Sequence, residues 1–188
     1  MKPRVYIIIM IAGAGAAAVA AGIVFTRNGA SEADLLGEKF YDPQMKLTFH
    51  PPAGWKPAPP EDKLRRIFSK ENSRMLAHFK GPKPGDSCNV VLYTADDRRL
   101  IELSRDETAS RDPSVKIKTL EFSFDKINDV PAWINQYAVG SAPFVIHNVQ
   151  VVLDRGDKKI MLLYGASVKS MRDQGAAVYA SIHSVRLD

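Results

Sequence analysis

The sequence predicts an α+β domain, in which helices cover a mainly antiparallel sheet of about six to seven strands (an α/β/α sandwich), preceded by one transmembrane helix. Three observations predict this fold class. Val5 to Phe25 is a run of 21 residues without a charged side chain. Short segments of alternating apolar residues then follow one another across tight turns, which is typical of antiparallel strands. The chain ends in a stripe of apolar residues at helical spacing.

The apolar run near the N-terminus fits a bilayer better than a nucleotide site. As a helix, Val5 to Phe25 would be about 32 Å long, enough to cross the hydrocarbon core. Gly13 to Ala18 also matches the G-x-G-x-x-A dinucleotide fingerprint. A helix on a nucleotide-binding sheet exposes one polar face, whereas Ala16 to Phe25 holds no polar residue. No regular alternation of strands and helices follows, so the fingerprint match is interpreted as a coincidence.

The same segment could be an anchor or a cleaved signal. Lys2 and Arg4 precede it, and Ala18 to Ala20 could form a cleavage box. The apolar residues continue past that box to Phe25, beyond the usual length of a signal, which favours an uncleaved anchor. Only Arg27 follows closely, so the N-terminus is expected in the cytoplasm. We expect a single-pass cell-membrane protein with an extracytoplasmic (periplasmic) C-terminal domain, or a secreted protein if the segment is cleaved.

Composition divides the chain into three parts: a span over residues 1–27, a polar linker over 28–44, and a folded domain over 45–188. The net charge is +5, but residues 1–27 supply three of these charges, and the remainder carries only +2. This low charge argues against a nucleic-acid partner. Cys88 is the single cysteine, so no intrachain disulfide can form, and its apolar neighbours predict a buried side chain.

The first half of the domain is predicted to consist mainly of strands. Met45 to His50 alternates with Leu47 and Phe49 on one face, as in a short strand. Five prolines within Pro51 to Pro60 predict a loop. The next strands are expected at Leu64–Lys70, Met75–Lys80 and Cys88–Thr94. Asp96 or Asp97 is then expected to cap a helix of about twelve residues ending near Ser110.

The second half is predicted to contain four strands and a long helix. In the strand Val115–Phe124, Val115 and Ile117 have the opposite parity to Leu120, Phe122 and Phe124, which predicts a bulge between the two groups. A further strand is expected at Ala132–Val139. The segments Phe144–Leu153 and Lys158–Gly165 flank Asp154-Arg155-Gly156-Asp157, a hairpin pattern.

The last element is an amphipathic helix. Its apolar stripe consists of Val168, Met171, Gly175, Val178, Ile182 and Val185. Ser167 is the expected N-cap. Arg186 follows the helix and is expected to interact favourably with the negative end of its dipole.

The sequence contains no recognisable catalytic or metal-binding motif. The four histidines, His50, His78, His147 and His183, do not have metal-ligand spacing. Ser123 to Lys126 matches S-x-x-K, but the partner motifs S-D-N and K-T-G are absent. The acidic pairs Asp96/Asp97 and Asp154/Asp157 are better explained by a helix cap and a turn. We therefore expect no enzyme activity, and no catalytic, cofactor or metal residues are assigned.

Three quoted stretches carry a family resemblance: "FYDPQMKLTFHPPAGWK" from Phe40, "NDVPAWINQYAV" from Asn128, and the end of the chain from "KKIMLLYGASVKS" to "AAVYASIHSVRL". Together they resemble PsbP-like domains over Phe40 to Leu187. The resemblance implies an antiparallel sheet between helices and a binding or assembly module without known catalysis. The wider superfamily of PsbP-like domains includes photosystem II extrinsic proteins, a Ran-binding nuclear import factor and bacterial envelope proteins. The expected anchor argues against a photosystem role.

The expected function is that of a non-enzymatic, membrane-tethered module that binds an envelope protein partner. The alternative is an envelope hydrolase or small-ligand binder whose site forms only in three dimensions. Candidate partner-binding residues are Trp55, Arg65 and Arg66. Trp55 is expected first to fold onto the edge of the core, with an exposed binding role as the alternative. Arg65 and Arg66 are expected on a solvated face.

Overall fold

The computed structural model describes residues 31–68, 72–94, 116–141 and 143–188. A seven-stranded antiparallel sheet has the order β3-β4-β5-β9-β8-β7-β6, and a three-stranded sheet has the order β1-β2-β10. The large sheet consists of β3 (Lys56–Pro57), β4 (Ser73–Lys80), β5 (Ser87–Tyr93), β6 (Ile117–Ile127), β7 (Val130–Ser141), β8 (Phe144–Arg155) and β9 (Lys158–Ser167). The small sheet consists of β1 (Phe40–Asp42), β2 (Leu47–Phe49) and β10 (Arg186–Leu187). The helices are α1 (Glu32–Leu35), α2 (Asp62–Phe68) and α4 (Val168–His183).

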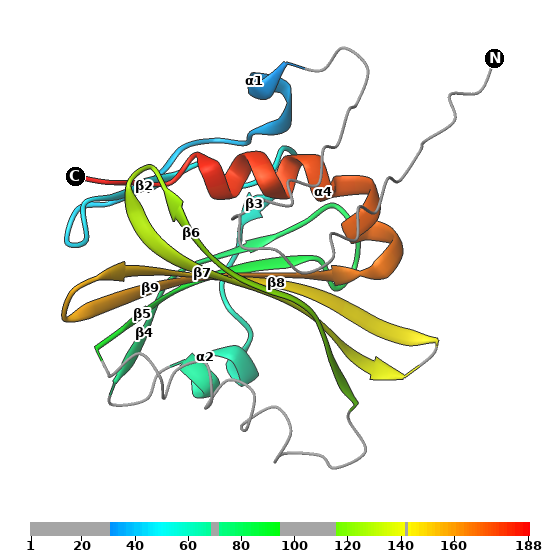
Figure 1. Ribbon diagram of the computed structural model, residues 1–188. Coiled ribbons are helices and arrows are strands. Elements are labelled where there is room, and N and C mark those ends of the chain that lie inside the picture. The colour runs from blue at the N-terminus through cyan, green and yellow to red at the C-terminus, as the bar shows by residue number, and fades with distance from the viewer. Residues whose placement is uncertain (1–30, 69–71, 95–115, 142) are drawn as a thin grey trace, which may run out of the picture.

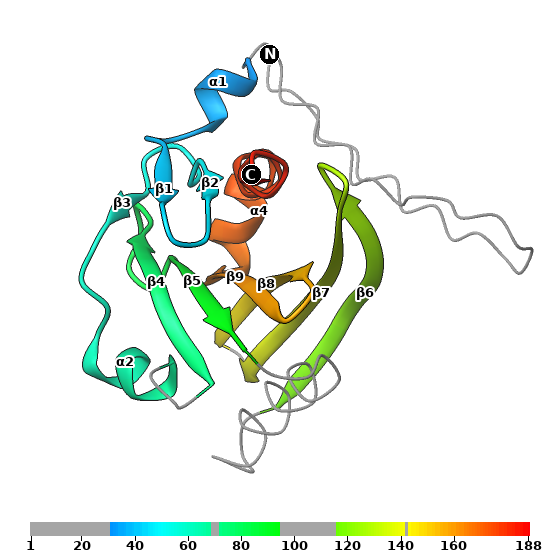
Figure 2. The ribbon, with the colours of Figure 1, turned by 90° about the vertical axis from the view of Figure 1, so that its left-hand side faces the viewer.

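Helices lie on both faces of the large sheet. In Figure 1, α4, α1 and the small sheet lie on one face, and α2 lies on the other. Figure 2 shows the large sheet curving around α4, with β4 on one side and β6 on the other. The predicted α+β class with a mainly antiparallel sheet and helices on both faces is therefore confirmed. The small sheet, which shares a face with α4, was not predicted.

The core has two parts because the central strands are covered on both faces. The larger part lies between the sheet and α4, and includes Val151, Leu162 and Tyr164, all fully buried. The smaller part lies under α2, where Phe68 packs with Val91, Val152 and Met161. Continuous apolar runs in β5, β8 and β9 are typical of strands buried on both faces.

The last helix forms as its sequence predicts. The Ser167 hydroxyl oxygen accepts a hydrogen bond of 3.1 Å from the Ser170 backbone N–H, which confirms the predicted N-cap. Met171, Val178 and Ile182 are buried against the sheet. At the other end, the Arg186 guanidinium donates to the carbonyl oxygen of His183 at 3.0 Å, as expected for a cation at a helix C-terminus.

The predicted bulge in β6 and the predicted turn between β8 and β9 are both present. The β6–β7 register shifts between Thr119 and Glu121, which confirms the predicted bulge. In the β8–β9 hairpin, Gly156 has a φ of 69°. A residue in this left-handed region lets a tight turn match the twist of its strands, and glycine adopts it without strain.

The predicted strand over Leu64–Lys70 is wrong, because the chain forms α2 there. Leu64 and Phe68 are four residues apart, so a helix places both on the face that packs against β4 and β5. Asp62 in the first turn also suits a helix N-terminus. The strand predicted after it is confirmed as β4.

The segment 28–44, expected as a polar linker, contributes structure to the domain from residue 31 onward. Phe40 of β1 pairs with Phe49 of β2, and its ring lies 5.5 Å from that of Phe49 and 5.9 Å from that of Phe79. The Gly37 N–H donates to the carbonyl oxygen of Pro51 at 2.7 Å. These aromatic and backbone contacts fix the segment to the large sheet, and the folded part therefore begins before Met45.

Two predicted elements lie outside the described residues: the membrane span Val5–Phe25 and the helix expected from Asp96 or Asp97 to Ser110. Among the helices of the described ranges, none combines the length and apolarity needed to cross a bilayer.

Candidate interaction surface

Trp55 lies in the core. Its side chain is only 3% exposed, and its ring lies 6.2 Å from that of Tyr164. The indole N–H donates to Gln174 Oε1 on α4 at 2.5 Å, so the one polar atom of the ring is satisfied inside the domain. The expectation that Trp55 folds onto the core therefore holds, and the ring offers no surface to a partner.

Arg65 and Arg66 are exposed in the last turn of α2. The opposite side of the helix packs on the sheet through Leu64 and Phe68. The two guanidinium groups therefore belong to a solvated helix face, as expected. Their role in partner binding stays a prediction.

A buried carboxylate ties the start of α4 to the sheet. Asp86 is 3% exposed, and its Oδ2 accepts hydrogen bonds from Ser170 Oγ at 2.7 Å and from Gln174 Nε2 at 2.8 Å. Ser170 is fully buried, so its hydroxyl is closed to a substrate. Because a nucleophile needs both a base and access to its target, this group is structural.

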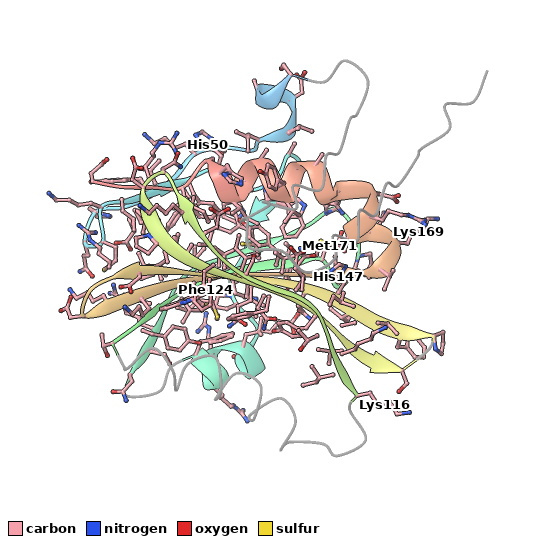
Figure 3. All side chains as sticks on the ribbon, viewed as in Figure 1. His50, Lys116, Phe124, His147, Lys169 and Met171 are labelled. Atoms are coloured by element: carbon pink, nitrogen blue, oxygen red, sulfur yellow. The ribbon has the colours of Figure 1, made fainter. Side chains whose placement is uncertain are left out.

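The histidines do not form a metal site. His78 Nδ1 lies 2.8 Å from Asn89 Oδ1, and His50 Nδ1 lies 3.0 Å from the carbonyl oxygen of Gly37. The His183 ring lies 4.2 Å from that of Tyr179. His147 lies on β8, where burial lowers its pKa below the ordinary value (Figure 3). Within the described residues, no three metal-ligating side chains come together.

The other polar motifs also have structural roles. In the β8–β9 turn, Asp154 accepts hydrogen bonds from the Gly156 N–H, at 2.9 Å, and from the Lys159 ammonium group. The S-x-x-K stretch from Ser123 to Lys126 lies on β6. Because side chains alternate along a strand, Ser123 and Lys126 lie on opposite faces of the sheet. Cys88 is fully buried, and burial raises the pKa of its thiol, which makes it unreactive.

The long strand β6 forms one edge of the large sheet. It is 11 residues long, and among the described strands it pairs only with β7. Phe124 is 69% exposed and Phe122 is 40% exposed, with ring centroids 5.2 Å apart. Phe124 also lies 6.0 Å from the half-buried Trp133 of β7. The bulge leaves Leu120 47% exposed beside them. In Figure 3, Phe124 lies on β6, and Lys116 lies just before the start of the strand.

We call Leu120, Phe122 and Phe124, with the outer edge of their strand, the β6 surface. Exposed aromatic side chains that cluster on one strand often mark a contact site. On the other face of β6 lie Lys118, Glu121, Ser123 and Asp125, as the pairing with Ala138, Gln136, Ile134 and Ala132 shows. Gln136 Nε2 donates to Glu121 Oε2 at 2.8 Å. The strand therefore has an apolar face and a charged face.

Comparison with solved structures shows which known fold this domain resembles. The solution structure of cyanobacterial PsbP (CyanoP) from Synechocystis sp. PCC 6803 is similar, with a TM-score of 0.60 over 89% of this chain and 100% of that chain, at 9% sequence identity. The domain has a PsbP-like fold. The crystal structure of LpqN, described as involved in cell envelope biogenesis of Mycobacterium tuberculosis, gives a TM-score of 0.53 over 80% of this chain and 89% of that chain, at 10% identity. No family model matches the sequence, and no curated protein matches it.

The residues that carry the sequence resemblance have a structural role, because they stabilise the PsbP-like fold. Phe40 packs on Phe49 and Phe79, Trp55 bonds to α4, and Arg186 binds the carbonyl end of that helix. Each therefore holds the layers of the PsbP-like domain together. None of the three belongs to the β6 surface.

Sequence reasoning did not identify the β6 surface of the PsbP-like domain. The alternation of Leu120, Phe122 and Phe124 predicts a strand with one apolar face, and such a face is usually buried. The predicted bulge is the one sequence signal that could have indicated an edge strand, because bulges are frequent in edge strands.

Proposed function

We propose that this chain is a non-enzymatic, membrane-tethered, extracytoplasmic module that binds a protein partner of the cell envelope through the β6 surface. The observation that carries the proposal is the pair of exposed phenylalanines, Phe122 and Phe124, on a long strand that pairs only with β7 among the described strands. The structural similarity to LpqN, a protein described as involved in cell envelope biogenesis, supports the proposal. The predicted span Val5–Phe25 supports the tether.

The β6 surface has the physical properties of a protein contact. Burying one phenylalanine side chain contributes about 1.5–3 kcal/mol. An edge strand also presents backbone N–H and C=O groups that a strand from a partner can pair with. A protein that supplies both apolar side chains and a strand would satisfy the two features at once.

The tether would hold the domain near the membrane. Five residues, 26–30, separate the end of the predicted span from Ser31. Fully extended, they reach at most about 18 Å. A partner of this module is therefore expected among proteins at or near the same membrane surface.

A site-specific crosslinking experiment tests the proposal. A photo-crosslinking amino acid replaces Phe124 in the full-length protein in intact cells, and irradiation is expected to give a discrete protein adduct, identified by mass spectrometry. The matched control is Tyr41, which is 53% exposed but lies on β1 of the small sheet. If neither position gives an adduct, or both give the same products, the proposed contact through β6 is wrong.

A further inference from the structure

We infer that the partner at the β6 surface is a second copy of this chain, whose β6 pairs antiparallel with the first across a two-fold axis at Phe122. The inference rests on the proposed function and names the partner of the same surface. Pairing of this kind would continue the seven-stranded sheet from one copy into the other.

The bulge decides which side chains would meet. Register partners on β7 place Lys118, Glu121, Ser123 and Asp125 on the α4 side of the sheet. They place Thr119, Phe122 and Phe124 on the opposite side. A paired strand must keep each side chain opposite one on the same face. The possible registers are therefore those in which residues on the α4 side of one β6 lie opposite residues on the α4 side of the other.

One register makes β6 complementary to itself. With Phe122 opposite Phe122 of the second copy, Lys118 lies opposite Asp125 and Thr119 lies opposite Phe124, each pair occurring twice. Lys118 and Asp125 are both exposed, so both are free of the core to make this contact. Glu121 then lies opposite Ser123, and no two like charges face each other. Opposite charges across a strand pair stabilise it.

The neighbouring registers are unfavourable. Moving the two-fold axis by one residue in one direction puts Glu121 opposite Glu121. Moving it by one residue in the other direction puts Glu121 opposite Asp125, twice. Like charges directly opposite each other destabilise a strand pair. Among these three registers, the charges on β6 therefore favour the one centred on Phe122.

The arrangement is also compatible with two anchors in one membrane. A two-fold axis perpendicular to the sheet keeps the α4 side of both copies on the same side. The N-terminal helix α1 lies on that side in each copy (Figure 1). Both predicted spans would then leave the dimer in the same direction. Tethering to one membrane also raises the effective concentration of one copy near another.

Cysteine crosslinking in membranes tests the register. In Phe122→Cys, the two new thiols lie directly opposite, where Cα atoms are about 4.5–5.5 Å apart and a disulfide can form. The full-length variant should give a covalent dimer on oxidation, and so should Thr119→Cys/Phe124→Cys. Phe124→Cys alone should not, because its two copies would be about 13 Å apart along the strands. The parent chain is the control, since its only cysteine, Cys88, is fully buried.

Charge reversal tests the same register without cysteines. Lys118→Glu turns two attractive pairs into repulsive ones and should weaken self-association about tenfold. Lys118→Glu/Asp125→Lys restores opposite charges and should restore the dimer. A double variant as weak as the single one would overturn the inference.

The outcomes separate this inference from the proposed function. If Phe122→Cys stays monomeric while the crosslinker at Phe124 captures a different envelope protein, self-pairing is wrong and the proposed function stands. If Phe122→Cys stays monomeric and Phe124 captures nothing, both are wrong. A disulfide dimer of Phe124→Cys alone, without one of Phe122→Cys, would also overturn the register.

Discussion

Full-length protein is expected to sediment with the membranes of lysed cells and to stay with them after an alkaline carbonate wash. A variant that lacks residues 1–27 should instead remain in the supernatant. The reason is that Val5 to Phe25 is long enough and apolar enough to cross the hydrocarbon core, whereas no helix of the described residues is. Because a spanning helix inserts almost irreversibly, the change should be nearly complete.

A terminal mass measurement is the control for this experiment. A mass that begins at or near Met1 in the membrane fraction supports an uncleaved anchor. A mass that begins near Ala21 indicates cleavage after Ala20 and a secreted domain. Full-length protein with Met1 intact in the supernatant would contradict the membrane tether.

The free energy of unfolding is expected to fall steeply as the pH rises above about 9–10. Burial raises the pKa of Tyr137 to about 12, and it also raises the pKa values of Tyr93, Tyr164 and Cys88. In the unfolded chain these groups lose their protons at lower pH than in the folded protein. Between the two pKa values the folded state binds more protons, so rising pH favours unfolding. Tyr137 alone should contribute a loss of roughly 2–3 kcal/mol by pH 12.

Chemical denaturation of the full-length protein in detergent, at pH 8 and at about pH 11, measures this effect. Tyr137→Phe removes one titrating group and should lose less stability between the two pH values than the parent does. Tyr41→Phe, at an exposed tyrosine, is the matched control and should behave like the parent. An equal loss in parent and Tyr137→Phe would show that Tyr137 is not held protonated by burial.

Elements that depend on local signals were predicted from the sequence. The Asp154-Arg155-Gly156-Asp157 turn, the Ser167 cap and the apolar stripe of α4 each determine their structure within a few residues. The bulge in β6 followed from a change of parity between Ile117 and Phe122. In these places the local preference and the tertiary packing agree.

Elements that depend on distant contacts were not predicted. The small sheet joins β1 and β2 to β10, where Leu187 pairs with Leu47, and no local pattern reveals such a pairing. Ile67 and Phe68 favour a strand by propensity, but the chain forms the helix α2 here, and Leu64 and Phe68 pack on the sheet from it. Tertiary packing decided the conformation of α2.

In the candidate site, too, the features that depend on distant contacts could not be predicted from local sequence. Trp55 could be core or contact residue by sequence, and its hydrogen bond to Gln174, 119 positions away, places it in the core. Phe122 and Phe124 alternate as core residues do, yet their strand is an edge strand in the sheet order. Strand order depends on the whole topology, so the exposure of these two rings could not be read from their neighbours in sequence.

Amide hydrogen exchange on the full-length protein in its membrane tests most directly whether the outer edge of β6 is covered. In the parent protein, the amides of β6 that point away from β7 should exchange slowly, because a paired strand protects them. Lys118→Glu should speed their exchange while leaving β7 and β8 unchanged. Fast exchange of these outward amides in the parent protein, equal to that in Lys118→Glu, would contradict binding through β6.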